Sequence, residues 1–283
     1  MKMIIPVLIF LISLNIYANN IRVMTFNTTC SVCEKGKYDK FKKRKYWILD
    51  TIKRANPDLI SLQEVLTTKQ LRWFKKKLKN KYFVQYYRKY FIFKYADPAL
   101  FIKKERFIVY RKGGFWLGPR SGRFSLGWKL AFPRQVRWTR LLDLENQKEL
   151  MFIGSHFDNK KKNKEKSVNL LIKKIEKLNI PIIFAADTNL KPNTEGYKKL
   201  KSIFKDTFDI KKNITLIGEN ATLDGSCNLE KAKSFPSCRV DHIFLSKKEK
   251  WNVGSWFVDQ VRYDNSKNFT SDHRAFYVDV QLQ

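Results

Sequence analysis

Short apolar runs that each end in an acid, an amide or a histidine most strongly limit what this chain can fold into. Residues 21–26 precede Asn27, residues 59–62 precede Gln63 and Glu64, and residues 182–186 precede Asp187. Runs of this length are typical of buried strands. Polar side chains at strand ends are how an α/β domain assembles a site from distant segments. The pattern therefore predicts an α/β fold with a site at one edge of its sheets.

The rest of the chain mixes helical and strand patterns. Apolar spacing predicts helices over 38–55, from Thr67 or Thr68 to about 79, and over 167–178. It predicts strands over 21–26, 59–62, 182–186, 240–245 and 275–282, the strand at 240–245 being interrupted by Asp241. It also predicts two strand pairs, 99–102 with 107–110 and 138–144 with 150–154. Strands and helices mixed in this way indicate a layered α/β domain.

The first eighteen residues read as a secretory signal peptide. Lys2 gives a positive start, residues 4–16 are almost all apolar, and Ala18 is a small residue before Asn19. The apolar stretch falls short of the ~20 residues that a membrane span needs, and an uncleaved anchor is the alternative. We therefore expect residues 1–18 to be removed on export, to the periplasm or outside the cell. Residues 19–283 would form one catalytic domain of 265 residues, 283 minus 18.

The net charge points to a polyanionic partner. Lys and Arg number 57 against 26 Asp and Glu, a formal net charge of +31. Such a surface attracts DNA, RNA, anionic lipid or acidic polysaccharide and speeds the encounter with them. A general compositional bias toward Lys is the alternative, but such a bias would also enrich Glu. We expect a functional preference for polyanions.

The four cysteines suggest disulfides, because the count is even and export is expected. The simplest pairing joins Cys30 to Cys33 and Cys227 to Cys238, although four cysteines allow three connectivities. A zinc site is the rival interpretation. The eleven-residue separation of the second pair does not suit zinc-ligand spacing.

Hydrolysis of a phosphodiester needs a hard cation, an oriented water and a donor for the charge that develops on phosphate. Carboxylates, amides and histidines at the strand ends can supply all three. Glu64 and Asp272 are expected to hold the metal. Asp187 and Asn189 can align the water and hold the phosphate. The imidazoles can donate protons or hydrogen bonds, and the two in question are His156 and His273.

Eight segments occur in an order that resembles a known family. They are MTFN (24–27), PDLISLQEV (57–65), FWLG (115–118), R-x-x-x-W-x-R-L (134–141), GSHFDN (154–159), IPIIFAADTN (180–189), RVDHIFLS (239–246) and SDHR (271–274). Together they are similar to the signatures of the deoxyribonuclease I-like endonuclease/exonuclease/phosphatase superfamily, from about Ile21 to the C-terminus. The FWLG and R-x-x-x-W-x-R-L segments look closer to a bacterial exported branch.

The resemblance implies a four-layer sandwich of two mixed β-sheets flanked by helices, and dependence on Mg²⁺, with Mn²⁺ or Ca²⁺ as alternatives. It implies that Asn27 helps to hold metal or phosphate and that Glu64 is the principal metal ligand. It assigns Asp187 and Asn189 to the Asp-x-Asn pair and places Asp241 behind the terminal His273, beside Asp272.

Two departures from the family pattern affect the expected site. Ala186 replaces the usual Gly before Asp-x-Asn, which narrows the approach to Asp187. In the family a Glu partners the histidine at the position of His156. The nearest candidate for that partner here is Asp97, and its shorter side chain makes the pairing less secure.

Basic side chains near these motifs are candidates for substrate binding. Arg134 and Arg137 precede a strand near the site, and a guanidinium fork suits phosphate oxygens. Structural pairing is the equal alternative for Arg134. Lysines at 160, 161, 162, 164 and 166 follow His156 and can contact a phosphate backbone. His242 alternates with Asp241 on a strand, so a structural role is expected for it.

The leading hypothesis is a secreted, metal-dependent, non-sequence-specific nuclease that prefers DNA over RNA and acts as a monomer. Charge, export and site agree with it, and no base-reading module is recognisable. A sphingomyelinase-like or inositol-phosphate phosphodiesterase or phosphatase on the same fold is the first alternative. Membrane association is not expected. A non-catalytic polyanion-binding protein is the second alternative, and the acids and histidines argue against it.

Overall fold

The computed structural model describes residues 20–33, 40–89, 93–210, 216–217, 222, 239–263 and 270–283. The expected signal peptide, residues 1–18, lies outside this part of the chain, as do Cys227 and Cys238. Within the described ranges, no helix combines the length and apolar character needed to cross a bilayer.

Two mixed β-sheets form the centre of the molecule. The strand order of the seven-stranded sheet is β10 (Leu216–Ile217), β12 (Trp251–Val258), β13 (Phe276–Leu282), β1 (Ile21–Asn27), β2 (Leu59–Gln63), β4 (Phe93–Lys103) and β3 (Tyr82–Lys89). The order of the six-stranded sheet is β5 (Phe107–Trp116), β6 (Gln135–Asp143), β7 (Lys148–His156), β8 (Ile182–Asp187), β11 (Asp241–Ser246) and β9 (Phe204–Asp206).

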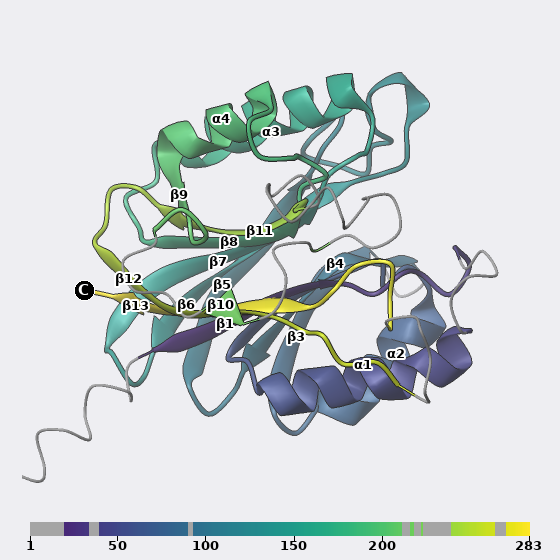
Figure 1. Ribbon diagram of the computed structural model, residues 1–283. Helices are drawn as coiled ribbons and strands as arrows, with labels where there is room; N and C mark the ends of the chain where they lie inside the picture. Colours follow the sequence, from purple (N-terminus) through teal and green to yellow (C-terminus); the bar gives the residue numbers. More distant parts are fainter. Residues whose placement is uncertain are drawn as a thin grey trace, which may run out of the picture.

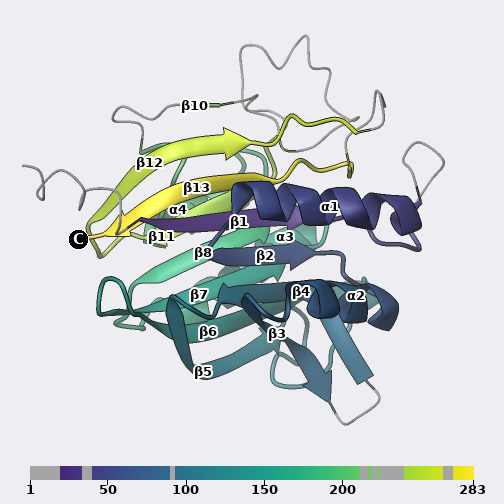
Figure 2. The same ribbon diagram turned by 90° about the horizontal axis from the view of Figure 1, so that it is seen from below.

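Helices cover both outer faces of this pair of sheets (Figure 1). Helices α1 (Phe41–Ala55) and α2 (Thr68–Leu78) lie against the seven-stranded sheet, and Figure 2 shows them across β1, β2 and β4. Helices α3 (Lys161–Ile175) and α4 (Glu195–Ile203) lie against the six-stranded sheet. A 3₁₀ turn, Trp128–Leu130, follows β5. The four layers confirm the fold class expected from the sequence.

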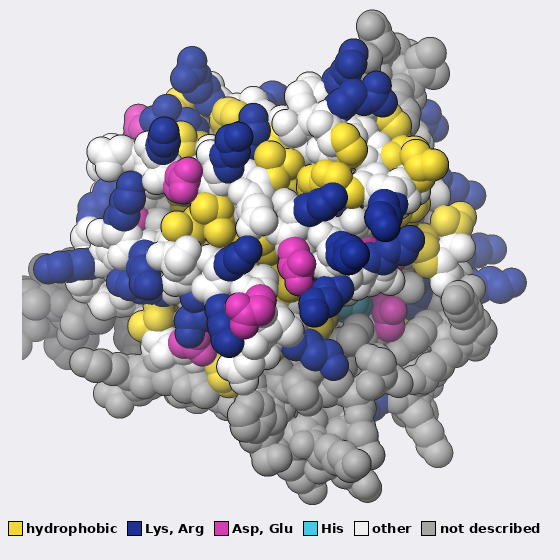
Figure 3. Space-filling model, turned by 90° about the horizontal axis from the view of Figure 1, so that it is seen from above, with side chains coloured by type: hydrophobic (Ala, Val, Ile, Leu, Met, Phe, Trp, Pro, Cys, Tyr) yellow, Lys and Arg dark blue, Asp and Glu magenta, His cyan; other side chains and the backbone are white. Residues whose placement is uncertain are grey.

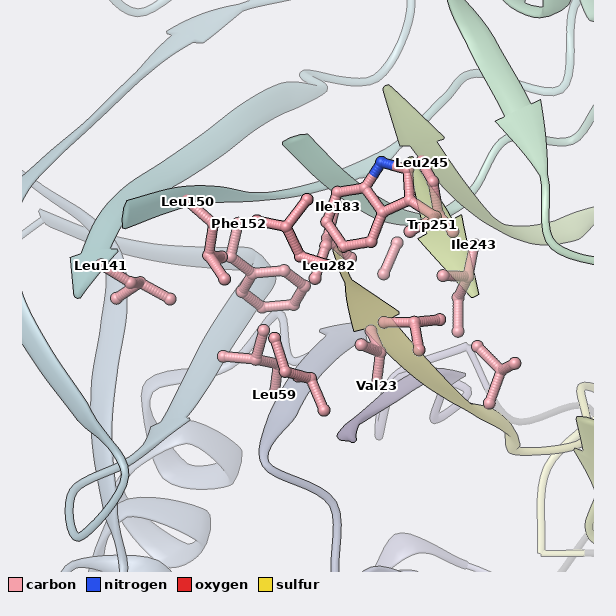
Figure 4. Close-up of a cluster of buried hydrophobic side chains, with 14 of the residues drawn as sticks. Val23, Leu59, Leu141, Leu150, Phe152, Ile183, Ile243, Leu245, Trp251 and Leu282 are labelled. Carbon is pink, nitrogen blue, oxygen red and sulfur yellow. The ribbon is translucent and has the colours of Figure 1, made fainter. Parts of the chain in front are cut away.

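Each interface between layers is filled by its own apolar cluster. Val23, Leu59, Phe152 and Ile183 are among the buried side chains between the two sheets (Figure 4). A second cluster packs α1 and α2 onto one sheet, and a third packs α3 and α4 onto the other. Strand side chains alternate between two faces. Because both faces of the central strands are covered, β2 and β8 are buried along their whole length, which explains their continuous apolar runs.

Local signals explain most element boundaries. Helix α1 ends where Asn56 adopts a left-handed conformation, with φ of 48°, ahead of Pro57. Helix α2 begins with a reciprocal capping box between Thr67 and Gln70, as the Thr at this position predicted. Helix α3 starts at Lys161 rather than at 167, so the lysine-rich stretch belongs to its first turns.

Two sequence-based expectations about the strands require correction. Segments 99–102 and 107–110 do not pair: β4 pairs with β2 and β3, whereas β5 pairs with β6 in the other sheet. The three residues between them carry the chain from one sheet to the other. Asp241 begins β11 instead of interrupting it. Strands β3, β9, β10 and β12 and helix α4 were not predicted from the sequence. By contrast, the expected pairing of β6 with β7 is confirmed.

Candidate active site

Strand register brings the polar strand ends together at one edge of the sandwich. In the first sheet β1 and β2 are parallel, and Asn27 pairs with Gln63, the residue before Glu64. In the second sheet β7 and β8 are parallel, and His156 pairs with Asp187. Strand β11 runs antiparallel to β8, so its first residue, Asp241, lies opposite Asp187. Contacts between β1 and β8 join the two edges into one cluster.

Asp97 is the partner of His156. The imidazole Nδ1 lies 3.0 Å from Oδ1 and 3.1 Å from Oδ2 of Asp97, and both side chains are buried. The backbone N–H of Glu64 donates to Asp97 Oδ1 at 3.0 Å. The shorter Asp side chain therefore reaches His156 Nδ1, because β4 places Asp97 directly beside the end of β7.

Arg134 completes this buried group. Its Nη1 lies 2.6 Å from Asp97 Oδ2 and 2.6 Å from Nδ1 of His156. Because Nδ1 donates to Asp97, we assign the Arg134 proton to the carboxylate as well. Burial raises the pKa of Asp97, but the charges of His156 and Arg134 lower it more strongly, to about 2. Of the two roles considered for Arg134, phosphate binding and structural pairing, the structure shows pairing, with Asp97 as the partner.

Asp187 lies at the centre of the cluster. Its Oδ2 lies 3.2 Å from Nε2 of His156 and accepts a hydrogen bond from Nδ2 of Asn27 at 3.0 Å. Its Oδ1 accepts from the backbone N–H of Asn189 at 3.0 Å. Burial raises the pKa of Asp187, but His156 and His273 lower it further, so that the pKa is below its usual value. The carboxylate is therefore ionised at neutral pH.

His273 is held by Asp241 on the other side of Asp187. Its Nδ1 lies 2.8 Å from Asp241 Oδ2, and its Nε2 lies 3.7 Å from Asp187 Oδ2. Burial lowers the pKa of His273, but the two carboxylates raise it well above the usual value for histidine. His156 shows the same balance: burial lowers its pKa, and Asp97 and Asp187 bring it above the usual value.

Glu64 and Asp272 both contact the loop that follows β1. Glu64 Oε2 accepts from the backbone N–H of Cys30 at 2.8 Å, and Oε1 accepts from Nδ2 of Asn27 at 3.2 Å. Asp272 Oδ1 accepts from the hydroxyl of Thr29. Glu64 has a left-handed backbone conformation, with φ of 62°, which is uncommon outside glycine. The amide of Asn27 thus bridges the carboxylates of Glu64 and Asp187.

These donors suit a hard divalent cation. Carboxylate and amide oxygens are the ligands such ions prefer, and Glu64, Asp272 and Asn27 supply them from one loop and its neighbours. On the other side, ligand atoms of Asp187, Asp241 and His273 lie within 4.8 Å of one another. There the imidazole Nδ1 is already engaged by Asp241, so we favour the Glu64 side for a metal. Cys30 and Cys33 are 5.1 Å apart at Cα with their sulfurs at bonding distance, so they are not metal ligands.

Arg44 is a site-supporting residue that the sequence analysis missed. It is fully buried on α1, and its guanidinium donates to the carbonyls of Thr28, Thr29 and Thr270 at 2.8–2.9 Å. These carbonyls belong to the two loops that carry Asn27 and Asp272. A signal did exist: position 44 falls on the buried stripe of α1 with Phe41, Ile48 and Ile52, where a charge needs a reason.

Among the basic residues expected to bind substrate, some are exposed near the cluster and others contact protein groups. Lys160, Lys161 and Lys162 are exposed at the start of α3, immediately after the His156 loop. Lys164 instead donates to the backbone carbonyl of Asn189 at 2.7 Å, beside the cluster. Arg137 lies apart: its Nε donates to Gln85 at 3.3 Å and its guanidinium lies over the ring of Tyr87.

His242 has the structural role that strand alternation predicts. It is buried on the opposite face of β11 from Asp241, with Nδ1 3.0 Å from Asp206 Oδ2 and Nε2 2.9 Å from the carbonyl of Leu190. Arg239 also donates to Asp206, at 2.6 Å. This network packs α4 and β9 against β11 and is separate from the cluster.

Two stacked mixed sheets, with helices outside and acids and histidines at a shared edge, define the phosphoesterase class of sandwich folds. A family model for the endonuclease/exonuclease/phosphatase family matches residues 13–273. The chain belongs to this family, whose members are hydrolases acting on phosphoester bonds. No curated protein matches the chain by sequence.

Solved structures share the fold over almost the whole chain. A family protein from Bacteroides thetaiotaomicron is similar with a TM-score of 0.77 and 24% identity, over 93% of this chain and 98% of that one. The mannosyl-6-phosphatase Bt3783 of the same organism gives 0.75 and 23%, over 92% and 99%. D. rerio TDP2 complexed with a single-stranded DNA product gives 0.69 and 17%, over 93% and 99%.

Proposed function

We propose that this chain is an exported, Mg²⁺-dependent phosphodiesterase that hydrolyses nucleic acid without sequence specificity, DNA in preference to RNA. The observation that carries the proposal is that the buried carboxylate of Asp187 lies between two imidazoles, His156 and His273, which are held by Asp97 and Asp241. The net charge of +31 supports a polyanionic substrate. The D. rerio protein in complex with single-stranded DNA provides a precedent for this substrate class on the same fold.

The roles follow from charge and position. Glu64 and Asp272, with Asn27, would hold the divalent ion, which when bound neutralises non-bridging phosphate oxygens. Ionised Asp187, fixed by Asn27 and the Asn189 N–H, orients the attacking water and accepts its proton as the new P–O bond forms. His273, protonated and held by Asp241, donates a hydrogen bond to the phosphate and gives its proton to the leaving oxygen as the old P–O bond breaks. His156, fixed by Asp97, keeps Asp187 in position.

A phosphomonoesterase is the second candidate, because the mannosyl-6-phosphatase shares the fold over 92% of this chain. The two functions make different demands. A monoesterase acts on a terminal phosphate, whereas a nuclease must also accommodate the chain on both sides of the scissile bond. The exposed lysines at the start of α3 favour the longer substrate.

Parallel assays test the proposal. The purified mature protein is incubated with Mg²⁺ and plasmid DNA, RNA, sphingomyelin or mannose 6-phosphate, each with an EDTA control. We expect Mg²⁺-dependent cleavage of DNA, weaker cleavage of RNA, and turnover of the other two near background. Glu64→Gln should abolish hydrolysis and keep the circular dichroism spectrum. Turnover restricted to mannose 6-phosphate or sphingomyelin, or full DNA cleavage by Glu64→Gln, would contradict the proposal.

A further inference from the structure

A pocket of about 510 Å³ lies on the outer face of the six-stranded sheet, beside the C-terminal half of α3. It is separate from the catalytic edge. Aromatic and aliphatic side chains form its floor and basic side chains its rim, and none of the nine residues that line it is acidic. They are Arg111, Lys112, Phe115, Trp138, Arg140, Met151, Lys174, Ile175 and Leu178.

The floor is built around an indole that lies on a glycine. A Cβ added at Gly113 of β5 would stand 2.4 Å from the Trp138 ring, so the ring occupies the space that a side chain would fill. Glycine within a strand weakens the strand and often marks a close approach. Here it lets Trp138 lie low over β5, the strand next to its own. Both Trp138 and Phe115 remain partly exposed.

Four basic side chains form the rim, and two of them contact neighbouring side chains. Arg111 and Lys174 are exposed on opposite sides of the pocket, on β5 and α3. Arg140 pairs with Glu149 at 3.0 Å, and Lys112 lies over the ring of Phe83. Figure 3 shows this face of the molecule with many dark-blue basic side chains around yellow apolar ones and few magenta acids. Aromatic side chains surrounded by basic ones suit a ligand that has a planar group and a negative charge.

The pocket and the cluster lie along the same strands. Trp138 pairs with Ile153 of β7, three residues before His156. At about 3.3 Å per residue along a strand and about 4.8 Å between neighbouring strands, the backbones of Trp138 and His156 lie about 11 Å apart. A strand of a few nucleotides can therefore reach both sites.

We propose that this pocket is an accessory site for single-stranded nucleic acid, with a base stacked on Trp138 and backbone phosphates on Arg111 and Lys174. The site extends the proposed function, on which its biological use rests, by giving the enzyme a hold on a strand distant from the bond it cleaves. An unpaired strand is required because only unstacked bases can lie on an aromatic ring. A bilayer surface fits less well, because the rings form the floor of a pocket and do not protrude from it.

Binding without hydrolysis tests the site directly. Fluorescence anisotropy in EDTA compares a labelled 20-nucleotide strand with an abasic strand of the same length and charge. We expect the parent to bind the base-bearing strand at least about five-fold more tightly. Trp138→Leu should abolish that preference and Trp138→Phe should retain most of it. Equal binding of both strands by the parent, or an unchanged preference in Trp138→Leu, overturns the proposal.

Charge is tested by the double variant Arg111→Gln/Lys174→Gln. Its log–log salt dependence on the single strand should flatten by about 1.4, at about 0.7 per lost contact. The matched control, Arg72→Gln/Lys76→Gln, removes the same charges from exposed positions on α2, on the opposite outer face. The control should keep the parent's slope to within experimental error. An equal change in both variants means that only net charge matters, and the site is then rejected.

A kinetic series separates this proposal from the proposed function. With Mg²⁺, the KM of the parent should fall steeply once strands exceed about three nucleotides, since ~11 Å corresponds to about three steps of ~3.4 Å. Trp138→Leu should lose this length dependence and keep kcat. Hydrolysis with an unaltered length dependence in the variant rejects the pocket alone. Base-dependent binding without any hydrolysis of nucleic acid rejects the catalytic function alone. If Trp138→Leu loses binding to anionic vesicles but still binds single strands as the parent does, the pocket is a membrane-binding site and the proposal is overturned.

Discussion

One buried carboxylate, Asp97, organises three parts of the candidate site. It accepts from the backbone of Glu64, from Arg134 and from His156, and so connects a metal-suited residue to an imidazole through a single side chain. An ionised Asp at this position is stable only because both cationic partners are present. The position therefore has an electrostatic requirement as well as a steric one.

Asp97→Asn is expected to reduce kcat by about 10²–10⁴-fold, because a neutral amide can neither fix the imidazole tautomer nor stabilise its charge. KM for DNA should change little. Steady-state kinetics and circular dichroism check the result.

Asp143→Asn is the matched control, since Asp143, at the end of β6, is equally buried and is paired with Arg106. It should lower the melting temperature and leave kcat per folded molecule near the parent's. A normal kcat in Asp97→Asn would show that the contact is structural only.

Asp206 predicts a pH dependence of stability. Burial raises its pKa, but Arg239 and His242 lower it more strongly, to below the usual value of 3.8. A carboxyl whose pKa is depressed in the folded state stabilises that state above its unfolded pKa and loses this contribution as the pH falls. We expect the free energy of unfolding to fall progressively below about pH 4.

Asp206→Asn isolates this contribution. Urea unfolding at pH 7 should show a loss of about 3–5 kcal/mol, because Arg239 is left buried without its counter-charge. The difference between variant and parent should shrink as the pH approaches 3. A difference independent of pH would contradict the assignment.

At the scale of single elements, α2 is defined by its cap. The hydroxyl of Thr67 accepts from the Gln70 N–H at 3.1 Å, and the Gln70 side chain accepts from the Thr67 N–H at 3.2 Å. Thr67 lies three positions after Glu64 in the sequence. Thr67→Ala should lower the free energy of unfolding by about 1 kcal/mol.

Thermal and urea unfolding measure the effect of the cap. Thr68→Ala is the control, because Thr68 is already inside the helix and should change stability by less than about 0.5 kcal/mol. DNA cleavage should persist in both variants. Equal effects at the two positions would mean that the hydroxyl of Thr67 does not cap the helix.

Strand pairing was harder to infer than strand existence. Segments 99–102 and 107–110 look like a hairpin because a short turn separates them, yet the chain crosses there from one sheet to the other. A hairpin and a sheet-to-sheet crossover have the same local pattern here, two continuous apolar runs around a polar turn. Only the burial of β4 between β2 and β3 distinguishes them.

For the whole molecule, the charge of +31 makes salt dependence the decisive property. The structure narrows the lysine set to test, since Lys164 is engaged by Asn189. Replacing lysines 160, 161, 162 and 166 together with Gln should flatten the log–log salt dependence of duplex DNA binding by about two to four units. It should raise KM for long DNA and leave turnover of a small chromogenic phosphodiester unchanged.

The control replaces lysines 53, 76, 77 and 79, which are exposed on the opposite face, on α1 or on and just after α2. Filter binding over a salt series compares the two. If the control flattens the slope as much as the test variant does, the start of α3 has no special role and the surface acts through its total charge alone.

The sequence by itself determined the α/β class, most helices and strands, and the family. It also indicated the residues that form the cluster, because side-chain types at strand ends are a local signal. It placed Asp97 opposite His156 only as a candidate. The wider pattern of acids, amides and histidines was readable because each motif follows a short apolar run.

Tertiary structure alone decided most strand pairings, the crossing of the chain from one sheet to the other between β4 and β5, and what the charged side chains contact. Arg44 holds the two metal-suited loops from a helix that is distant in sequence from one of them, and Arg137 packs beside β3 instead of joining the cluster. Trp138 forms a pocket only because Gly113, on the neighbouring strand, leaves room for its ring. The physical reason is common to all three: backbone propensity and apolar periodicity are properties of neighbouring residues, whereas a buried charge or ring is placed by groups that folding brings near from elsewhere in the chain.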